Sequence, residues 1–332
     1  MSESKAGGIA DDELRPLDLV TLGGVLKVCE VEMVLLDNAG PRAAITSRVH
    51  DGVLLCTAET GFRFRGRFML PLDWCLLGFV HQTGDAGSWC HGTPLECGAV
   101  VTVLPDGISE FALSAGTRVT FMLVPLKRFD QKFSELNLGR VTPPGNSASL
   151  FRAGEWQEAR ELQQLCEHVR QRLVSSADMS GVQETSIGEA YLHKHLQAML
   201  SASGSDRPTC SRGRHTHYLI LQRAENFMRS NLRRNIYMHE ICNAAGVSER
   251  ALRYAFDNLL GISPNRYLSM LRLCSACRSL SMTDASRRSV KSIALSYGLW
   301  DLSRFADNYR RIFGELPRET LLRAPSNGIE AG

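Results

Sequence analysis

The C-terminal third of the chain contains one sequence pattern twice, and this repeat restricts the fold more than any other feature. The first copy starts at Ile236 and the second at Ser289. Matching residues are 52 positions apart up to a glycine and 53 positions apart after it, so the second copy gains one residue just after its turn. A repeat of this length indicates a duplicated supersecondary unit. The matching pairs are Ile241 and Ile293, Gly246 and Gly298, Leu252 and Phe305, Phe256 and Tyr309, Gly261 and Gly314, and Pro264 and Pro317.

Each copy predicts two short helices joined by a tight turn. Gly246 and Gly298 stand where the chain reverses, because glycine adopts a left-handed conformation without a steric penalty. Ser248 and Asp301 follow as side chains that can cap the N-terminus of the next helix. We therefore expect a helix-turn-helix motif in each copy.

The second helix of each copy has an apolar face and a polar face. Leu252 and Phe256, like Phe305 and Tyr309, are four positions apart and predict contact with a core. The opposite face is free and polar, as a helix that enters the major groove of DNA requires. Its residues are Glu249, Arg250, Arg253 and Tyr254 in the first copy, and Leu302, Ser303, Arg304, Asp307 and Asn308 in the second.

Between the copies, residues 263–282 predict one long helix. Its apolar side chains Leu268, Leu271, Ala276 and Leu280 lie on or near one face. A rigid helix of this kind would hold the two reading helices at a fixed separation. Successive major grooves require about 34 Å between them.

The charge distribution agrees with a nucleic-acid partner for this region. Residues 212–323 contain 19 Lys and Arg against 9 Asp and Glu, whereas the rest of the chain contains 19 against 26. A basic C-terminal third beside an acidic remainder indicates that one domain meets nucleic acid and the other does not.

The second copy, SVKSIALSYGLWDLSRFADNYRRIFGELP, resembles the signature of the AraC/XylS family, and residues 217–322 resemble its DNA-binding domain. The sequence departs from the family at Leu299, where phenylalanine is usual. The resemblance implies that one chain reads two adjacent groove segments of double-stranded DNA. Position by position, it assigns base reading to Arg250, Arg253, Ser303 and Arg304. Further candidate DNA contacts are Ser248, Tyr254, Asp307 and Asn308, with Arg310 and Arg311 meeting phosphates or acidic partners; Asp307 has a salt bridge to a neighbouring arginine as its alternative role.

The N-terminal part has a different pattern. Residues 25–125 contain short apolar runs separated by Gly, Asp and Pro, with alternation as in Phe62-Arg63-Phe64-Arg65. This predicts an antiparallel β barrel or sandwich, and the family resemblance implies a cupin-like sensory barrel. Two amphipathic helices follow, near residues 156–173 and 186–200, which either form a dimer seam or cover the barrel. The predicted fold class is α+β, with an N-terminal antiparallel β barrel and an all-α C-terminal domain.

The expected boundaries follow from these patterns. They are a disordered start at 1–20, a β-rich sensory domain at 21–135, a helical and candidate dimerisation region at 136–200, a linker at 201–215, the DNA-binding domain at 216–324 and a tail at 325–332.

A ligand or metal site is harder to find in the sequence. Trp74, Phe79, His81 and Trp89 are candidates for lining a ligand pocket, or else belong to the plain core. The histidines of the β-rich region are far apart in sequence, and the C-x-x-C at Cys274 has no second ligand pair. We therefore expect no metal site, no cofactor and no catalytic residues.

The sequence thus predicts a sequence-specific transcription regulator, expected to be an activator, controlled by a small molecule or partner at its N-terminal domain. Its expected partners are double-stranded DNA, RNA polymerase, a small-molecule effector and a second copy in a homodimer. The N-terminus lacks a signal peptide pattern and no run of apolar residues could span a membrane, so we expect a cytoplasmic protein. The alternatives are a cupin-type metal enzyme with a DNA-binding tail and a ligand-independent repressor.

Overall fold

The computed structural model describes residues 14–16, 28–29, 31–38, 40–137, 148–154, 156–174, 181–202 and 206–323. The predicted tail at 325–332 and all but residues 14–16 of the predicted disordered start lie outside these ranges. No helix in the described ranges is both long enough and apolar enough to cross a membrane.

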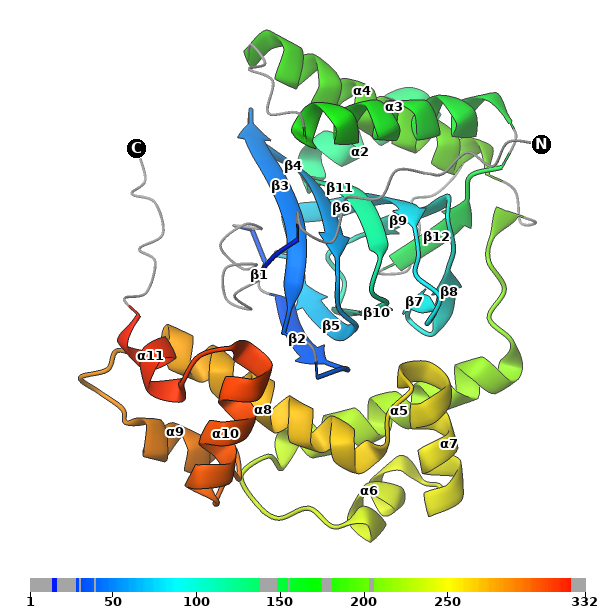
Figure 1. Cartoon of the computed structure of the whole chain (residues 1–332). Coiled ribbons are helices and arrows are strands. Elements are labelled where there is room, and N and C mark those ends of the chain that lie inside the picture. Colours follow the sequence, from blue (N-terminus) through cyan, green and yellow to red (C-terminus); the bar gives the residue numbers. More distant parts are fainter. Residues whose placement is uncertain are drawn as a thin grey trace, which may run out of the picture.

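The N-terminal half contains two antiparallel sheets that face each other (Figure 1). The first has seven strands in the order β1 (Arg15–Pro16), β3 (Arg42–His50), β4 (Val53–Thr60), β11 (Thr117–Pro125), β6 (Trp74–Gln82), β9 (Ala99–Val103) and β12 (Ala148–Arg152). The second has five, in the order β2 (Val31–Leu35), β5 (Phe64–Met69), β10 (Ile108–Leu113), β7 (Ser88–Cys90) and β8 (Thr93–Leu95). The sheet-rich region is therefore present as predicted, but its strands form two separate sheets rather than one closed barrel.

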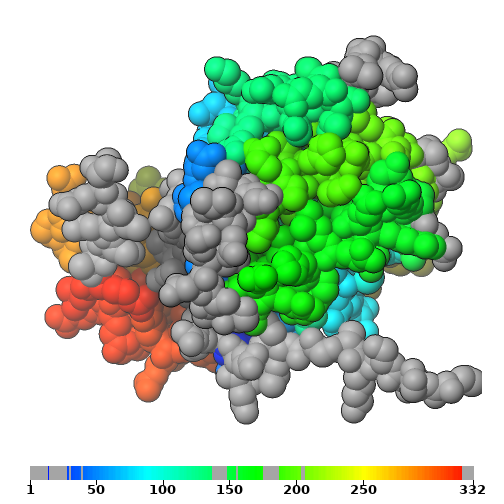
Figure 2. Space-filling model, turned by 90° about the horizontal axis from the view of Figure 1, so that it is seen from above, coloured from blue at the N-terminus to red at the C-terminus, as the bar shows by residue number. Residues whose placement is uncertain are grey.

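Three helices cover the outer face of the seven-stranded sheet: α2 (Leu126–Asn137), α3 (Gln157–Val174) and α4 (Gly181–Ser201) (Figures 1 and 2). The apolar stripe expected on the first amphipathic helix is buried in α3 at Ala159, Leu162, Cys166, Val169 and Leu173. It packs with side chains of the seven-stranded sheet in one core. The apolar side chains of α3 therefore pack on the sheet, which is one of the two roles considered for this helix.

The C-terminal region is helical throughout. It comprises α5 (Arg212–Ser230), α6 (Met238–Ala245), α7 (Glu249–Leu260), α8 (Pro264–Met282), α9 (Val290–Ser296), α10 (Leu302–Phe313) and α11 (Pro317–Leu322). Helix α5 begins inside the segment expected to be a linker. The long helix predicted between the two copies is α8, which begins after the capping residue Ser263. It is buried on more than one face, because it packs against helices of both copies and against β2.

A buried ion network joins the five-stranded sheet to the helical region. Arg65 on β5 is fully buried and lies 3.1 Å from Glu110 on β10 and 3.0 Å from Glu225 on α5. Tyr218 donates a hydrogen bond to Glu110, and Tyr267 on α8 donates one to Glu225, each at 2.6 Å. Removing a single partner from such a network leaves a buried charge unpaired, which is strongly destabilising. The two regions therefore meet across a specific polar contact as well as a shared apolar core.

Candidate nucleic-acid interface

The first copy folds into the helix pair α6 and α7 through local capping interactions. Helix α6 ends at Gly246, whose φ of 69° is left-handed. Ser248 then accepts a hydrogen bond from the backbone nitrogen of Ala251 at 3.3 Å, which satisfies a free donor in the first turn of α7. Gly261, with φ of 63°, ends α7. The turn and both ends of α7 are thus where the sequence places them.

Helix α7 turns its apolar residues to the core and its polar residues to solvent. Leu252 and Phe256 are fully buried, whereas Arg250, Arg253 and Tyr254 are exposed. Arg253 forms an ion pair with Glu249 at 2.6 Å, one turn earlier on the same surface. The predicted polar face therefore exists and is accessible.

Tyr254 and two residues that the sequence analysis missed extend this surface. The Tyr254 ring lies edge-on to His217 of α5, with ring centroids 5.0 Å apart. Asp257 lines a shallow depression together with Ser248, Arg250 and Tyr254. The spacing of Asp257, three residues after Tyr254 on one helix, could have indicated that Asp257 belongs to this surface. The contact of Tyr254 with His217 could not be predicted from the sequence, because it joins two different helices.

The second copy forms the pair α9 and α10 in the same way. Gly298 has φ of 70° and follows α9, which ends at Ser296. Asp301 accepts a hydrogen bond from the backbone nitrogen of Arg304 at 3.0 Å and caps α10. Gly314, with φ of 77°, ends that helix. The segment between the turn glycine and the second helix is one residue longer here than in the first copy, as the spacing of the repeat predicts.

Helix α10 has the same division into two faces. Phe305 and Tyr309 are buried, and the Tyr309 hydroxyl shares a hydrogen bond of 2.7 Å with Thr320 of α11. The exposed candidates are Ser303, Arg304, Asp307, Arg310 and Arg311, and Asn308 is half-buried. Arg311 donates a hydrogen bond to the side-chain oxygen of Asn308 at 2.9 Å.

Most of each helix pair lies on the side of α5 and α8 away from the sheets, whereas the C-terminal ends of α7 and α10 reach the sheet region (Figure 1). They occupy opposite ends of α8, which packs against both. All ten candidate DNA contacts are at least partly accessible to solvent: nine of them are exposed, and Asn308 is half-buried. The surface can therefore offer guanidinium, amide and hydroxyl donors from two helices to an extended polyanion.

The four candidate ligand residues do not gather in one place. Phe79 lines a cavity between the two sheets. His81 shares a hydrogen bond of 2.8 Å with Thr120, and burial lowers the pKa of its imidazole to about 4. Trp74 packs in a separate apolar cluster. Trp89 is fully buried and donates a hydrogen bond to the carbonyl oxygen of Leu259 in α7 at 2.9 Å.

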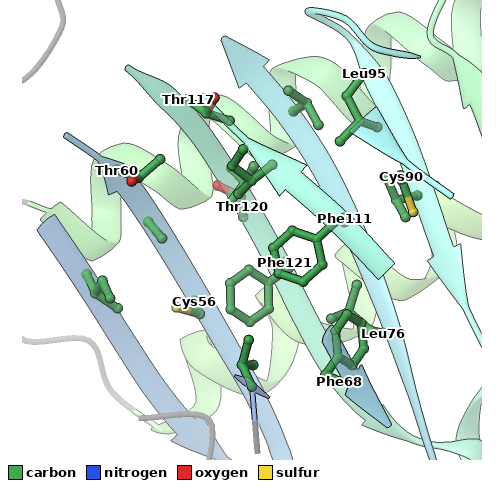
Figure 3. A pocket seen from close by; sticks show the side chains of 18 of the residues that line it. Cys56, Thr60, Phe68, Leu76, Cys90, Leu95, Phe111, Thr117, Thr120 and Phe121 are labelled. Carbon is green, nitrogen blue, oxygen red and sulfur yellow. The ribbon is translucent and has the colours of Figure 1, made fainter. Parts of the chain in front are cut away.

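The cavity between the sheets has a volume of about 190 Å³ (Figure 3). Strands of both sheets contribute its aromatic wall, in which Phe111 and Phe68 come from the five-stranded sheet and Phe121 from the seven-stranded sheet. Side-chain hydroxyls are present at Thr60 and Thr117. Alternation along a strand identifies inward-facing residues, but the pairing of distant strands, which encloses the cavity, has no local signal.

Neither the C-x-x-C nor any other group in the described ranges forms a metal-ligand cluster. Among these residues, no three His, Cys, Asp or Glu side chains are arranged to hold a metal ion. Cys274 and Cys277 are buried thiols on α8 that form no disulfide, and burial raises the pKa of Cys274 to about 12. Both side chains serve as packing residues of the helix.

Comparison with known proteins agrees with this geometry. A helix-turn-helix domain model matches residues 241–323. The chain is 40% identical over 100 residues to the XylDLEGF operon transcriptional activator of Pseudomonas putida, over 30% of this chain and 31% of that protein. It is 37% identical over 128 residues to XylDLEGF operon transcriptional activator 3 of the same organism, over 39% of this chain and 37% of that protein. The match thus spans about a third of the length of these curated relatives.

A solved structure adds a second comparison. A probable AraC family transcriptional regulator from Rhodopseudomonas palustris CGA009 is 34% identical, over 32% of this chain and 96% of that chain, with a TM-score of 0.29.

The fold and this surface define a DNA-binding protein of the helix-turn-helix class. Within that class, its C-terminal region is similar to that of the operon transcriptional activators of Pseudomonas putida.

Proposed function

We propose that this protein is a sequence-specific transcription regulator that reads two segments of one DNA duplex with α7 and α10. The observation that carries the proposal is the pair of capped helices with free polar faces at the two ends of α8. Both helix pairs act as helix-turn-helix motifs. Arg250, Arg253, Ser303 and Arg304 contact base edges. The remaining candidates, Ser248, Tyr254, Asp307, Asn308, Arg310 and Arg311, contact bases or the phosphate backbone.

The domain organisation of this regulator follows the predicted boundaries except at the linker. A cupin-like sensory domain spans residues 21–135, and a mainly helical region, which also contributes β12 to the sheet, spans 136–200. Because α5 begins at Arg212, we shorten the proposed linker to 201–211 and begin the DNA-binding domain at 212. The protein activates transcription through contact with RNA polymerase, as a homodimer. The names of the relatives, which are operon activators, support the sign of regulation.

The cavity between the sheets is the candidate effector site. The residues that line it are apolar apart from hydroxyls, thiols and one carboxylate, Glu59, which is already paired with Arg118 at 2.8 Å. An ionised ligand would therefore lose its hydration there without gaining a free charged partner. An apolar cavity of about 150 Å³ is large enough to bind benzene, and this one is somewhat larger, at about 190 Å³. We therefore propose a neutral effector of the size of a substituted aromatic ring.

Selection from random-sequence DNA tests the proposed function. The full-length protein is used to enrich duplexes, and the enriched sequences are bound again with and without benzene derivatives. The proposal predicts one motif with two short segments about one helical turn apart. Enrichment of no motif, or of a motif with a single segment, would contradict it.

A further inference from the structure

The sheet region reaches the DNA-binding surface at the C-terminal end of α7. Arg63, between β4 and β5, donates a hydrogen bond from Nη2 to the carbonyl oxygen of Leu260 at 2.7 Å. Trp89 on β7 donates one from Nε1 to the carbonyl oxygen of Leu259 at 2.9 Å. The last carbonyl groups of a helix have no partner within it and carry partial negative charge. Arg63 and Trp89 therefore supply two of the donors that the last turn of α7 needs.

Both donors are themselves held firmly by the sheet region. The backbone nitrogen of Arg63 donates to the Asp37 side chain at 2.9 Å, and its carbonyl accepts from Leu36 at 2.9 Å. The Trp89 ring is fully buried, with the Arg65 guanidinium 4.9 Å from its centroid and the Tyr218 ring at 5.8 Å. The backbone of Arg63 and the ring of Trp89 are thus both held in place beside α7.

The end of α7 is shaped to receive Arg63. A Cβ atom at Gly261 would lie 2.8 Å from Nη2 of Arg63, closer than such atoms approach each other. Gly261 also has a left-handed φ of 63°, so a side chain there would be strained for a second reason. Glycine at this position both ends the helix and leaves room for the guanidinium.

The sheet region contacts the two reading helices differently. Helix α10 meets the sheet region at Gly40, which has no side chain and comes close to the carbonyl of Ile312. Helix α7 instead accepts two hydrogen bonds at its last turn, from Arg63 and Trp89, next to the buried ion network on α5. Any movement of the sheet region relative to α8 must therefore act on α7 directly.

We propose that Arg63 and Trp89 are positioning residues for DNA reading, which fix the orientation of α7 relative to α10 by holding its C-terminal carbonyls. The inference rests on the proposed function, in which α7 reads one segment of the duplex. The contact also lies next to the cavity, because Phe62 and Phe64, the residues before and after Arg63 in the sequence, both line the cavity.

The test uses the full-length protein and the variant Arg63→Met, which keeps an unbranched side chain but removes the donors. Arg42→Met is the matched control, because Arg42 also donates to a backbone carbonyl, that of Leu14, within the sheet region. Three duplexes are compared: one selected by the wild-type protein, and two in which either segment is scrambled. The segment read by α7 is the one at which Arg250→Ala becomes insensitive to base changes.

Arg63→Met is expected to weaken binding to the selected duplex about tenfold, the order expected for a lost hydrogen bond from a charged group. The loss disappears when the α7 segment is scrambled and persists when the α10 segment is scrambled. Arg63→Lys, which keeps a cationic donor, is expected to recover part of the affinity, and Arg42→Met to bind like the wild type. Unchanged affinity of Arg63→Met, or an equal loss on all three duplexes, would overturn the inference.

Amide hydrogen exchange of the free protein measures the same contact without DNA. In Arg63→Met, the amides of residues 249–260 are expected to exchange faster, with those of residues 302–313 unchanged. Uniform or unchanged exchange would also overturn the inference. If the wild-type protein selects no duplex, the proposed function fails, and the exchange result alone decides whether the sheet region holds α7.

Discussion

At the scale of single residues, the most consequential group is a carboxylate rather than an arginine of the DNA-binding surface. Burial by itself would raise the pKa of Glu225, but Arg65, Arg229 and Arg67 and the hydrogen bond from Tyr267 outweigh it and hold the pKa at about 2. The folded protein therefore keeps this carboxylate ionised well below the pH at which the unfolded chain protonates it.

The pH dependence of stability follows from that shift. Because the folded pKa is depressed, the stabilisation from Glu225 is complete above its ordinary pKa of 4.5 and is lost as the pH falls toward 2. Glu225→Gln is expected to lower the free energy of unfolding near neutral pH by about 3 kcal/mol, because Arg65 loses one of its two carboxylate partners and Arg229 loses a buried one. Urea unfolding of the wild-type protein and the variant measures this loss of stability. The pH is varied between about 5 and 2, the range over which Glu225 is protonated in the unfolded chain and then in the folded protein. A wild-type protein and a variant with parallel pH profiles would contradict this account.

At the scale of elements, two glycines of the second helix pair have unequal surroundings: Gly298 in its turn and Gly314 at the end of α10. A Cβ atom at Gly298 would lie 2.5 Å from the carbonyl oxygen of Leu232, whereas one at Gly314 would meet nothing within 4 Å. Both glycines have a left-handed φ, so both substitutions carry backbone strain. Only the first also forces a collision with backbone.

The pair Gly298→Ala and Gly314→Ala separates these two costs. Gly314→Ala is expected to lower the free energy of unfolding by about 1 kcal/mol, the cost of a left-handed conformation for alanine. Gly298→Ala is expected to cost at least about 2 kcal/mol more, because the backbone of α9 must move. Chemical denaturation of the two variants measures the difference. Equal losses would show that the contact with Leu232 relaxes without cost.

The elements also show what the sequence could and could not predict. Ser248, Asp301, Gly261 and Gly314 act on residues within one turn of themselves, so their roles could be predicted and are confirmed. The order of the strands could not be predicted, since β4 and β11 pair residues about 60 positions apart, such as Thr60 with Thr117. Trp89 was a candidate either for a ligand pocket or for the core, and its hydrogen-bond partner in α7 lies 170 residues away in the sequence. Capping residues can be recognised from neighbouring residues in the sequence, whereas contacts between distant segments cannot.

At the scale of the whole molecule, a sheet region and a helical region are joined by a buried ion network and a shared apolar core. The ion network on α5 and the donors at the end of α7 lie on one face of the five-stranded sheet. The other face of that sheet lines the cavity. A single layer of strands thus separates the proposed effector site from the contacts that hold α7. A structural change at one of them can therefore be transmitted to the other through these strands.

The central claim is that α7 and α10 read two separate segments of one duplex. Its most direct test is the affinity of the wild-type protein, Arg250→Ala and Arg304→Ala for every single base-pair substitution in a selected duplex. Each variant should lose about 1–3 kcal/mol of specific binding and become insensitive to base identity in one segment. The two insensitive segments should be about one helical turn apart, and salt-dependent binding to unrelated DNA should change little. Insensitivity of both variants in the same segment, or a uniform loss on all sequences, would contradict the claim.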